Sequence, residues 1–331
     1  MELDSPLISF CIPTYNRERY LIKSLESIIF QLDSARKKNL VEILISDNCS
    51  TDNTALLAGN YLRSRPDLNI RLISNLTNLG MDGNFLNCYN NALGMYVCLV
   101  SDDDFLLPDS VAYILQVLEQ NPGIDGIFLN PFPIAGCLPE TEGICFNKDN
   151  MLELIGNRLI HLGAILFKRE IFNKGQYDVY NGTFLVISYI FLDVLRNGQG
   201  IQFNLRKFYE ITQNNSGGYN FFDVFVTSYC DLLDKAAQLN FSKSSVNKMR
   251  TQHLRYFILP FVIDIRLNDS YKRMKRSFKE GFILILNRFG FQPIVLWGVI
   301  PALFAPRLFW SGVRVLFRLR RRLIDLLQAG S

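Results

Sequence analysis

Apolar and polar positions over the first 130 residues follow two alternating periods, and the pattern predicts strands followed by helices. Four short apolar runs are typical of buried strands and cover residues 7–12, 41–46, 70–74 and 96–100. Apolar residues recur at helical spacing over residues 17–33, 51–63, 83–93 and 110–119. This order predicts an α/β fold with a mostly parallel sheet, helices on both faces, and ligands beyond the carboxyl ends of the strands.

The pattern weakens after residue 130 and becomes helical again toward the C-terminus. Prolines and glycines over residues 131–143 indicate loops and short strands. Helical spacing returns at residues 184–195 and 221–239, and we expect helices for most of the chain after residue 242. The chain therefore divides into an α/β part, residues 1–220, and a mainly helical part, residues 221–331.

The first predicted strand stops at Pro13, and the segment Pro13-Thr14-Tyr15-Asn16-Arg17 leads into a helix. Unpaired backbone N–H groups at a helix N-terminus attract anions and Arg17 adds a cation, so a nucleotide could bind there. The alternative is a plain strand-to-helix turn in which Asn16 is the N-cap.

The second predicted strand leads into the segment Ser46-Asp47-Asn48-Cys49-Ser50-Thr51-Asp52-Asn53. An acidic residue at a strand end, here Asp47, can accept hydrogen bonds from a ribose or a base edge. The alternative is an Asx-rich turn in which Ser50 or Asp52 caps the next helix. A glycine-containing stretch at residues 78–84 lacks the spacing of a dinucleotide site or a P-loop, and it reads as a turn.

Three successive carboxylates, Asp102, Asp103 and Asp104, follow the strand that ends at Val100. Like charges this close repel one another, and a cation between them relieves the repulsion. Oxygen ligands suit Mg²⁺ or Mn²⁺, which are held by one or two carboxylates together with substrate phosphates. The alternative is a solvated acidic turn in which Asp109 or Ser110 caps the next helix.

Together, PTYNR at residues 13–17, SDNCSTD at 46–52, NLG at 78–80 and SDDD at 101–104 followed by Pro108 resemble the motifs of the family 2 glycosyltransferases. The wording is most similar to bacterial O-antigen sugar transferases, such as the abequosyltransferase-like proteins. The resemblance covers residues 6–130. It implies a GT-A (Rossmann-like) nucleotide-sugar-binding domain at residues 1–220, with a donor half at 1–130, an acceptor half at 131–220, and a helical C-terminal extension.

The same resemblance implies roles for matching positions. Asp47 would contact the base or ribose of the donor, and a manganese or magnesium ion on the diphosphate would be held by Asp104 and Asp103. Relatives often have Asp-x-Asp-Asp where this chain begins with Ser101, so Asp104 is the first choice of ligand. The predicted nucleotide-binding residues are Pro13, Thr14, Tyr15, Asn16, Arg17, Asp47, Asn78, Gly80, Asn84, Asp102 and Asp103.

The general base has no matching motif. Relatives often carry a Glu-Asp pair upstream of a glycine like Gly198, where this chain has Val186-Ile187. Asp193 and Asp178 are the nearest carboxylates and are the predicted catalytic residues, with His161 as a third candidate. For each carboxylate the favoured alternative is an ordinary surface residue, because most acidic residues lie on the surface.

The C-terminal part is basic and contains a long uncharged run. Residues 250–331 hold 15 Lys and Arg against 4 Asp and Glu, a net +11, which leaves 20 against 27, a net −7, for residues 1–249. Residues 289–306 carry no charge, but three prolines interrupt them. This favours two short segments, packed on the protein or entering one leaflet, over one membrane span.

Arginines after this run fall on one face of a predicted helix, namely Arg307, Arg314, Arg318 and Arg321. Such a helix resembles those that lie on anionic lipid surfaces. A solvated charged face is the alternative. Nucleic-acid binding explains the uncharged block poorly, so we predict a membrane-surface partner and no nucleic acid.

Seven cysteines without CxxC spacing suggest neither a disulfide framework nor a zinc site, and no signal peptide is recognised at the N-terminus. We therefore expect a cytoplasmic protein, peripheral on the inner membrane. The function implied by the resemblance is inverting, metal-dependent transfer from a nucleotide-sugar to a lipid-linked oligosaccharide in O-antigen or other surface polysaccharide synthesis. The alternative is a catalytically silent nucleotide-sugar-binding scaffold, because the Glu-Asp pair is missing.

Overall fold

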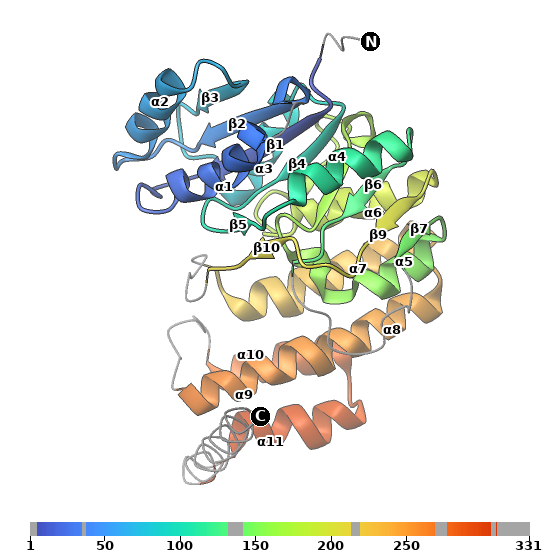
Figure 1. Cartoon of the computed structure of the whole chain (residues 1–331). Helices are drawn as coiled ribbons and strands as arrows, with labels where there is room; N and C mark the ends of the chain where they lie inside the picture. The colour runs from blue at the N-terminus through green and yellow to red at the C-terminus, as the bar shows by residue number, and fades with distance from the viewer. Residues whose placement is uncertain are drawn as a thin grey trace, which may run out of the picture. The chain divides into compact units, whose positions relative to one another are not determined.

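The computed structural model describes residues 5–34, 38–131, 142–212, 219–268, 277–305 and residue 309. The chain forms two compact units, one of residues 1–215 with 240–245 and one of residues 216–239 with 246–331. Figure 1 shows the strands of the sheet in the first unit and helices in the second.

An eight-stranded mixed sheet forms the centre of the first unit, in the order β3-β2-β1-β4-β8-β6-β9-β7. Strands β3, β2, β1 and β4 are parallel, and β8 is antiparallel to both of its neighbours, β4 and β6. The strands are β1 (Ile8–Thr14), β2 (Val41–Asp47), β3 (Ile70–Ser74), β4 (Tyr96–Leu99), β6 (Gly126–Phe128), β7 (Gly143–Cys145), β8 (Ile165–Lys168) and β9 (Ile201–Phe203).

The four strands predicted in the donor half are present, but β1 continues through Pro13 to Thr14 rather than stopping before the proline. Pro13 lacks an N–H donor, which normally interrupts a ladder. Pairing of β1 with β4 ends at Cys11, and the Thr14 carbonyl oxygen accepts from Asn48 N of the β2 side at 2.9 Å. Pro13 therefore faces the β4 side beyond the last pair, where no hydrogen bond is lost.

Helices cover both faces of the parallel half. Helix α1 contacts both α2 and α4, whereas α3 packs against β1, β2 and β4 and against α6. The helices of this unit are α1 (Leu21–Ser34), α2 (Thr54–Ser64), α3 (Gly80–Asn91), α4 (Ser110–Gln120), α5 (Lys148–Ile155) and α6 (Val186–Asn197), with short turns η1 (Lys38–Leu40), η2 (Gly156–Ile160), η3 (Arg169–Ile171) and η4 (Asp178–Tyr180).

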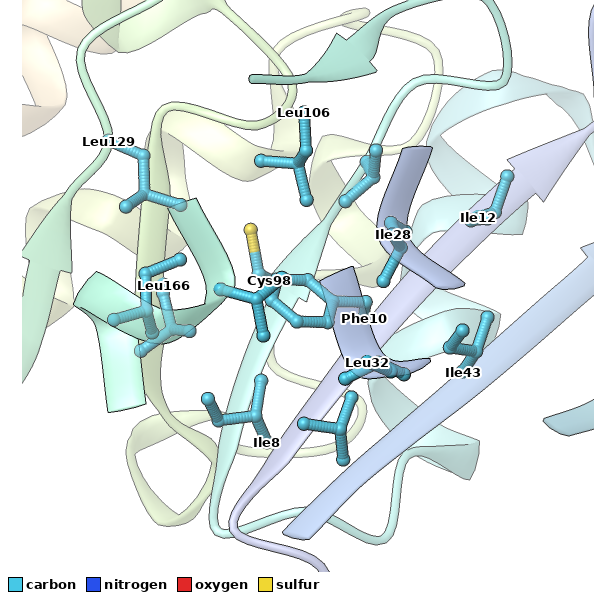
Figure 2. Close-up of a cluster of buried hydrophobic side chains, with 14 of the residues drawn as sticks. Ile8, Phe10, Ile12, Ile28, Leu32, Ile43, Cys98, Leu106, Leu129 and Leu166 are labelled. Carbon is cyan, nitrogen blue, oxygen red and sulfur yellow. The ribbon is translucent and has the colours of Figure 1, made fainter. Parts of the chain in front are cut away.

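The core beneath α1 follows from the alternation of side chains along β1. Ile8, Phe10 and Ile12 point to one face and pack with Ile28 and Leu32 of α1 (Figure 2). The intervening Ser9 and Cys11 are also fully buried, on the other face. A strand buried on both faces has few polar positions, which explains why β1 reads as a mostly apolar run.

A two-stranded ribbon of β5 (Phe105–Leu106) and β10 (Tyr209–Glu210) lies outside the main sheet. The sequence did not reveal this pairing, because each strand has two residues and they lie far apart in the chain. Because β10 pairs with β5, the residues that follow β10 lie next to the loop after β4.

The second unit is helical in the described residues, which confirms the predicted helical extension. Its core is aromatic: Phe221 stacks on Phe261 with ring centroids 3.5 Å apart. No helix described here is both long and apolar enough to cross a bilayer. The helices after β10 are η5 (Asp223–Ser228), α7 (Tyr229–Gln238), α8 (Lys243–His253), η6 (Leu254–Ile258), α9 (Leu259–Asn268), α10 (Phe278–Phe289), η8 (Val295–Val299) and α11 (Ile300–Phe304).

Candidate nucleotide-sugar site

The loops after β2, β1 and β4 meet at one edge of the sheet. These three strands are adjacent and parallel, so their carboxyl ends lie together. The loops contain Asp47, Arg17 and Asp102, which the sequence singled out from separate segments. This edge is where α/β sheets bind their ligands.

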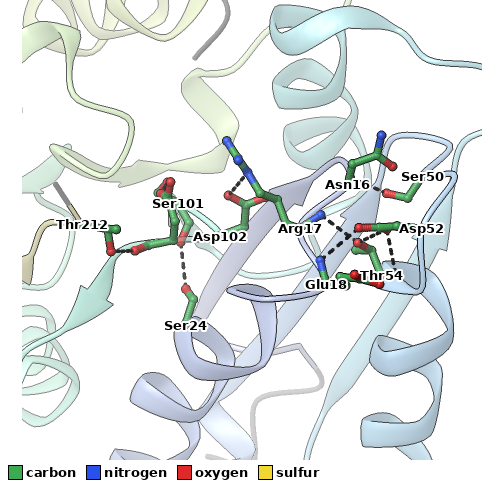
Figure 3. Close-up of polar contacts among 11 residues, drawn as sticks. Asn16, Arg17, Glu18, Ser24, Ser50, Asp52, Thr54, Ser101, Asp102 and Thr212 are labelled. Atoms are coloured by element: carbon green, nitrogen blue, oxygen red, sulfur yellow. Dashed lines mark hydrogen bonds and ion pairs between the residues drawn. The ribbon is translucent and has the colours of Figure 1, made fainter. Parts of the chain in front are cut away.

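The loops after β1 and β2 are joined by hydrogen bonds (Figure 3). Asn16 N donates to Ser50 Oγ at 2.9 Å, and the Asn16 side chain accepts from Thr51 N at 2.8 Å. Arg17 N donates to Thr54 Oγ1 at 2.8 Å. The Asn16 N-cap interpretation is wrong, because α1 begins only at Leu21 and Asn16 has a left-handed backbone with φ 54°.

Asp47 ends β2 and is buried. Its Oδ2 accepts from Ser50 N at 3.2 Å. Its Oδ1 is also buried and has no hydrogen-bond partner among the residues that the structure describes. A buried carboxylate oxygen without a donor is unfavourable, so a ligand N–H or O–H at this position would be stabilising.

An asparagine network supports the loop after β2. The Asn48 amide donates to Asn78 Oδ1 at 2.9 Å and to Gly80 O at 3.0 Å, and its oxygen accepts from Leu79 N at 2.9 Å. Asn84 is buried and bonded to the Ser46 hydroxyl and carbonyl groups at 2.6 and 3.0 Å. These contacts give Asn78, Gly80 and Asn84 a supporting role: they fix the strand end that carries Asp47.

Residues 78–80 were expected to be a turn before a helix at residue 83, and the helix α3 in fact begins at Gly80. The alternative in which Asp109 caps α4 is wrong, because Asp109 precedes α4 but makes no side-chain capping bond. Asp52 does accept from Thr54 N at 2.9 Å and from Glu18 N at 3.3 Å. It thereby joins the start of α2 to the loop after β1.

Asp102 is buried beside a partly exposed cation. Arg17 Nε lies 3.5 Å from Asp102 Oδ1. The two side chains point toward each other in Figure 3. Burial raises the pKa of Asp102 to about 7, even though the charge of Arg17 acts in the opposite direction. A further positive charge near this carboxyl group would lower its pKa and favour loss of the proton.

Asp103 and Asp104 are held by neighbours from three segments. Ser101 Oγ donates to Asp103 Oδ1, and the Ser101 carbonyl accepts from Ser24 Oγ of α1 at 2.8 Å. Thr212, just after β10, donates its N–H to Asp104 Oδ1 at 3.1 Å and its hydroxyl to the Asp103 carbonyl. The β5–β10 ribbon therefore fixes the carboxylate loop in place.

His161 contacts the same loop from the acceptor half. Its Nε2 lies 3.4 Å from Asp104 Oδ2, and its Nδ1 accepts from Gly163 N at 3.3 Å. Since Nδ1 is an acceptor, the proton of the neutral ring lies on Nε2, directed at Asp104. Gly163 is required nearby, because a Cβ there would lie 2.7 Å from the Tyr209 ring and 3.2 Å from the Leu99 carbonyl oxygen.

The donor set after β4 has the chemistry of a magnesium or manganese site. Three buried carboxylates stand in a row, which suits a hard divalent cation whose remaining ligands are phosphate oxygens and water. Within the described ranges, no cluster of three or more potential ligand side chains is arranged around one point. Coordination of a divalent cation by one or two of these carboxylates, with phosphate oxygens as further ligands, would be compatible with this donor set.

The two predicted bases lie in different surroundings. Asp193 accepts from Tyr177 Oη at 3.0 Å and pairs with Arg196 at 2.8 Å. Asn197, one turn later in α6, donates to Asp125, which directly precedes β6. The start of β6 lies at the opposite end of the strands from the loop that carries Asp102–Asp104. Asp178 is exposed in η4, which contacts α3.

Asp82 is a buried carboxylate whose structural role was not predicted from the sequence. This carboxylate is buried in the first turn of α3 and accepts from Gly182 N at 2.9 Å, Phe184 N at 2.7 Å and Val186 N at 3.4 Å. It joins the donor half to the start of α6, where relatives often carry their acidic pair. No local pattern marks this role, since the partners lie 100 to 104 residues away.

The fold and site define the class of protein. The family model Glycosyl transferase family 2 matches residues 9–175, which is half of the chain. The protein therefore belongs to glycosyl transferase family 2, and the resemblance seen in the four motifs is confirmed.

Curated relatives match part of the chain. Abequosyltransferase RfbV of Salmonella typhimurium is 42% identical over 199 residues, which is 54% of this chain and 57% of that protein. The GalNAc(5)-diNAcBac-PP-undecaprenol beta-1,3-glucosyltransferase of Campylobacter jejuni is 32% identical over 138 residues, covering 42% and 40% of the two chains. The chain thus spans only about half the length of these relatives.

Solved structures share the fold over most of the chain. TarS 1–349 of S. aureus in complex with UDP has a TM-score of 0.56 and 16% identity, covering 93% of this chain and 91% of that one. Mannosyltransferase PcManGT from Pyrobaculum calidifontis, in complex with GDP-Man and Mn²⁺, has a TM-score of 0.56 and 14% identity, covering 94% and 84%. The predicted GT-A-type α/β class with a helical C-terminal region is confirmed.

Proposed function

We propose that this protein transfers a sugar from a nucleotide-sugar to a lipid-linked oligosaccharide in O-antigen or another surface polysaccharide pathway. The donor site rests on one observation: Asp47 Oδ1 is buried beside the loop that holds Asp102–Asp104 and has no hydrogen-bond partner among the residues that the structure describes. The family supports sugar transfer, and the name of the Campylobacter jejuni relative, which includes an undecaprenol-linked glycan, supports a lipid-linked acceptor. The cytoplasmic face of the inner membrane is the location that belongs to this proposal.

Each group of site residues has a role that follows from its position. Asp47 accepts a hydrogen bond from the base or ribose, and the backbone of Thr14–Arg17 lies alongside it, held by Ser50 and Thr54. Asp104 and Asp103 hold the divalent cation, and Thr212 and His161 orient Asp104. When bound, Mn²⁺ or Mg²⁺ neutralises the charge of the departing nucleoside diphosphate.

Inversion requires a base that removes the proton of the acceptor hydroxyl as it attacks. Asp178 and Asp193 remain the predicted candidates. Asp178 is the better placed, because it is exposed in the segment that leads to the Asp82 contacts, whereas Asp193 is already bonded to Tyr177 and Arg196. Loss of kcat in Asp178→Asn, with donor binding unchanged, is the expected result for the base.

A silent scaffold is the second candidate, and one observation favours it. Val186 and Ile187 are buried at the start of α6, and the Val186 N–H is bonded to Asp82. No carboxylate side chain therefore takes the place of the acidic pair of relatives at these two positions. Release of nucleoside diphosphate in the presence of acceptor extracts separates an enzyme from a scaffold.

Calorimetric titration tests the donor site. UDP, GDP, CDP and dTDP are titrated in Mn²⁺ and in EDTA against the wild type, Asp47→Ala and Asp104→Ala. We expect one nucleotide to bind in Mn²⁺, with about 10-fold or greater weakening in either variant. Asp109→Asn, an exposed position in the same loop, is the matched control. Binding of no nucleotide to the wild type would refute the donor site.

A further inference from the structure

The outer side of the uncharged segment in the second unit is aromatic and exposed. Trp297 of η8 is 82% exposed, and Phe291 and Phe304 are 75% and 52% exposed. The opposite side of the same segment is also apolar: Val295 and Val299 are fully buried in the core of this unit. Both sides of these helices are therefore apolar.

An ordinary surface helix has a polar outer face. Here Trp297, Pro301 and Phe304 follow one another at helical spacing, all are exposed, and no charged residue occurs between residues 289 and 306. The patch extends to α10, because Phe304 packs edge-on against Phe282 with centroids 5.3 Å apart and the neighbouring Ile283 is 45% exposed. Exposed apolar surface of this kind marks an interaction site.

Internal packing prevents these helices from turning the aromatic face inward. A Cβ on Gly298 would lie 3.1 Å from Leu259 Cδ2 of α9, so η8 sits close against α9 at this glycine. The buried Val295, Val299 and Leu303 fix the same orientation. Trp297 is consequently held outward by the fold of its own unit.

The charge of the flanking sequence identifies the partner. Residues 250–331 carry a net +11, and Arg307, Arg314, Arg318 and Arg321 follow the aromatic segment in the sequence. Tryptophan and phenylalanine beside arginine are the composition of segments that lie at the headgroup level of anionic bilayers. A protein partner would not require this excess of positive charge.

We propose that Phe291, Trp297 and Phe304 enter the interface of an anionic phospholipid bilayer and dock the second unit on it. The inference rests on the proposed function, because a lipid-linked acceptor is presented at such a surface. It adds the element that makes the contact. These aromatic side chains provide the apolar area, and the basic sequence around them provides the attraction to the headgroups.

Vesicle sedimentation of the full-length protein tests the proposal. Vesicles of phosphatidylethanolamine with phosphatidylglycerol should retain the wild type, and the Phe291→Ser/Trp297→Ser variant should partition about 10-fold or more weakly. The matched control is Phe30→Ser in α1 of the first unit, where the side chain is 80% exposed, and it should bind as the wild type does. Equal retention of wild type and double variant would overturn the proposal.

Fluorescence gives a second readout that does not depend on affinity. The chain has two tryptophans, so a Trp310→Phe protein reports Trp297 alone. Its emission should shift to shorter wavelength on vesicles, and an unchanged emission from vesicle-bound protein would contradict insertion. If light scattering finds a dimer that the double variant dissociates while vesicles retain neither protein, the partner is a second copy and the bilayer proposal fails.

Nucleotide titration of the same proteins separates this proposal from the donor site. The double variant should keep the nucleotide affinity of the wild type, and Asp47→Ala should keep its vesicle binding. If the wild type binds vesicles but no nucleotide, the docking proposal stands and the proposed donor site is refuted. If the wild type binds nucleotide but no vesicles, only the docking proposal is refuted.

Discussion

The raised pKa of the buried Asp102 makes the free energy of unfolding depend on pH. Burial raises the pKa of this carboxyl group from 3.8 to about 7 in the folded protein. Each tenfold change in proton affinity is about 1.4 kcal/mol, so the difference corresponds to about 4 kcal/mol. The folded state binds the proton more tightly than the unfolded state.

The protonated carboxyl group therefore favours the folded state at low pH. The contribution to stability is fully present below pH 3.8 and is lost as the pH rises through about 7. Asparagine resembles the protonated acid and never ionises. Asp102→Asn should therefore be nearly neutral at pH 4, and at pH 8 it should raise the free energy of unfolding by up to about 4 kcal/mol relative to wild type.

Urea unfolding of both proteins from pH 4 to pH 8, in EDTA, measures this difference. EDTA removes divalent cations that would stabilise the ionised carboxylate. Asp109→Asn provides the matched control at an exposed position near the same loop. A difference between Asp102→Asn and wild type that stays constant across this range would refute the reasoning, because the group would then titrate alike in folded and unfolded protein.

Three further substitutions test other parts of the structure. Gly126→Ala should lower the free energy of unfolding by about 2 kcal/mol or more in urea titrations, because a Cβ would overlap the Leu166 carbonyl oxygen on β8. Burial lowers the pKa of His253 to about 3, so the folded protein resists protonation of this ring. As the pH falls from 6.5 through 3, the free energy of unfolding of wild type should drop by up to about 5 kcal/mol relative to that of His253→Gln. Parallel pH profiles of the two proteins would contradict this. Asn48→Ala removes the hub of the asparagine network and should weaken nucleotide binding about 10-fold in calorimetry, and unchanged affinity would show that the network does not position Asp47.

The sequence predicted the parallel strands well, because β1, β2 and β4 are buried along their length and give mostly apolar runs, and the edge strand β3 is short and mostly apolar as well. Strand β3 has the predicted ends, and β2 and β4 differ from theirs by one residue. The start of α1 was predicted four residues too early, at Arg17. The segment before Leu21 is held by contacts with Ser50 and Thr54, which lie more than thirty residues away and leave no local pattern.

The antiparallel half was harder to predict from the sequence. Strands β6, β7 and β9 have three residues each, too few for a period to be recognised. Their pairing depends on contacts between segments far apart in the chain, such as Ile144 opposite Gln202. The ribbon that brings Thr212 to Asp104 arises in the same way.

The sequence by itself determined the α/β class, the family and the segments that carry Arg17, Asp47 and Asp102–Asp104, because these depend on local patterns and motif wording. The tertiary structure decided what each side chain does. Asp47 Oδ1 is buried with no hydrogen-bond partner in the described part of the chain. Asn84 supports the end of β2 through Ser46, and His161 and Thr212 contact Asp104. Burial and hydrogen bonding are properties of the packed chain, so residues that look alike in the sequence acquire different roles only when distant segments come together.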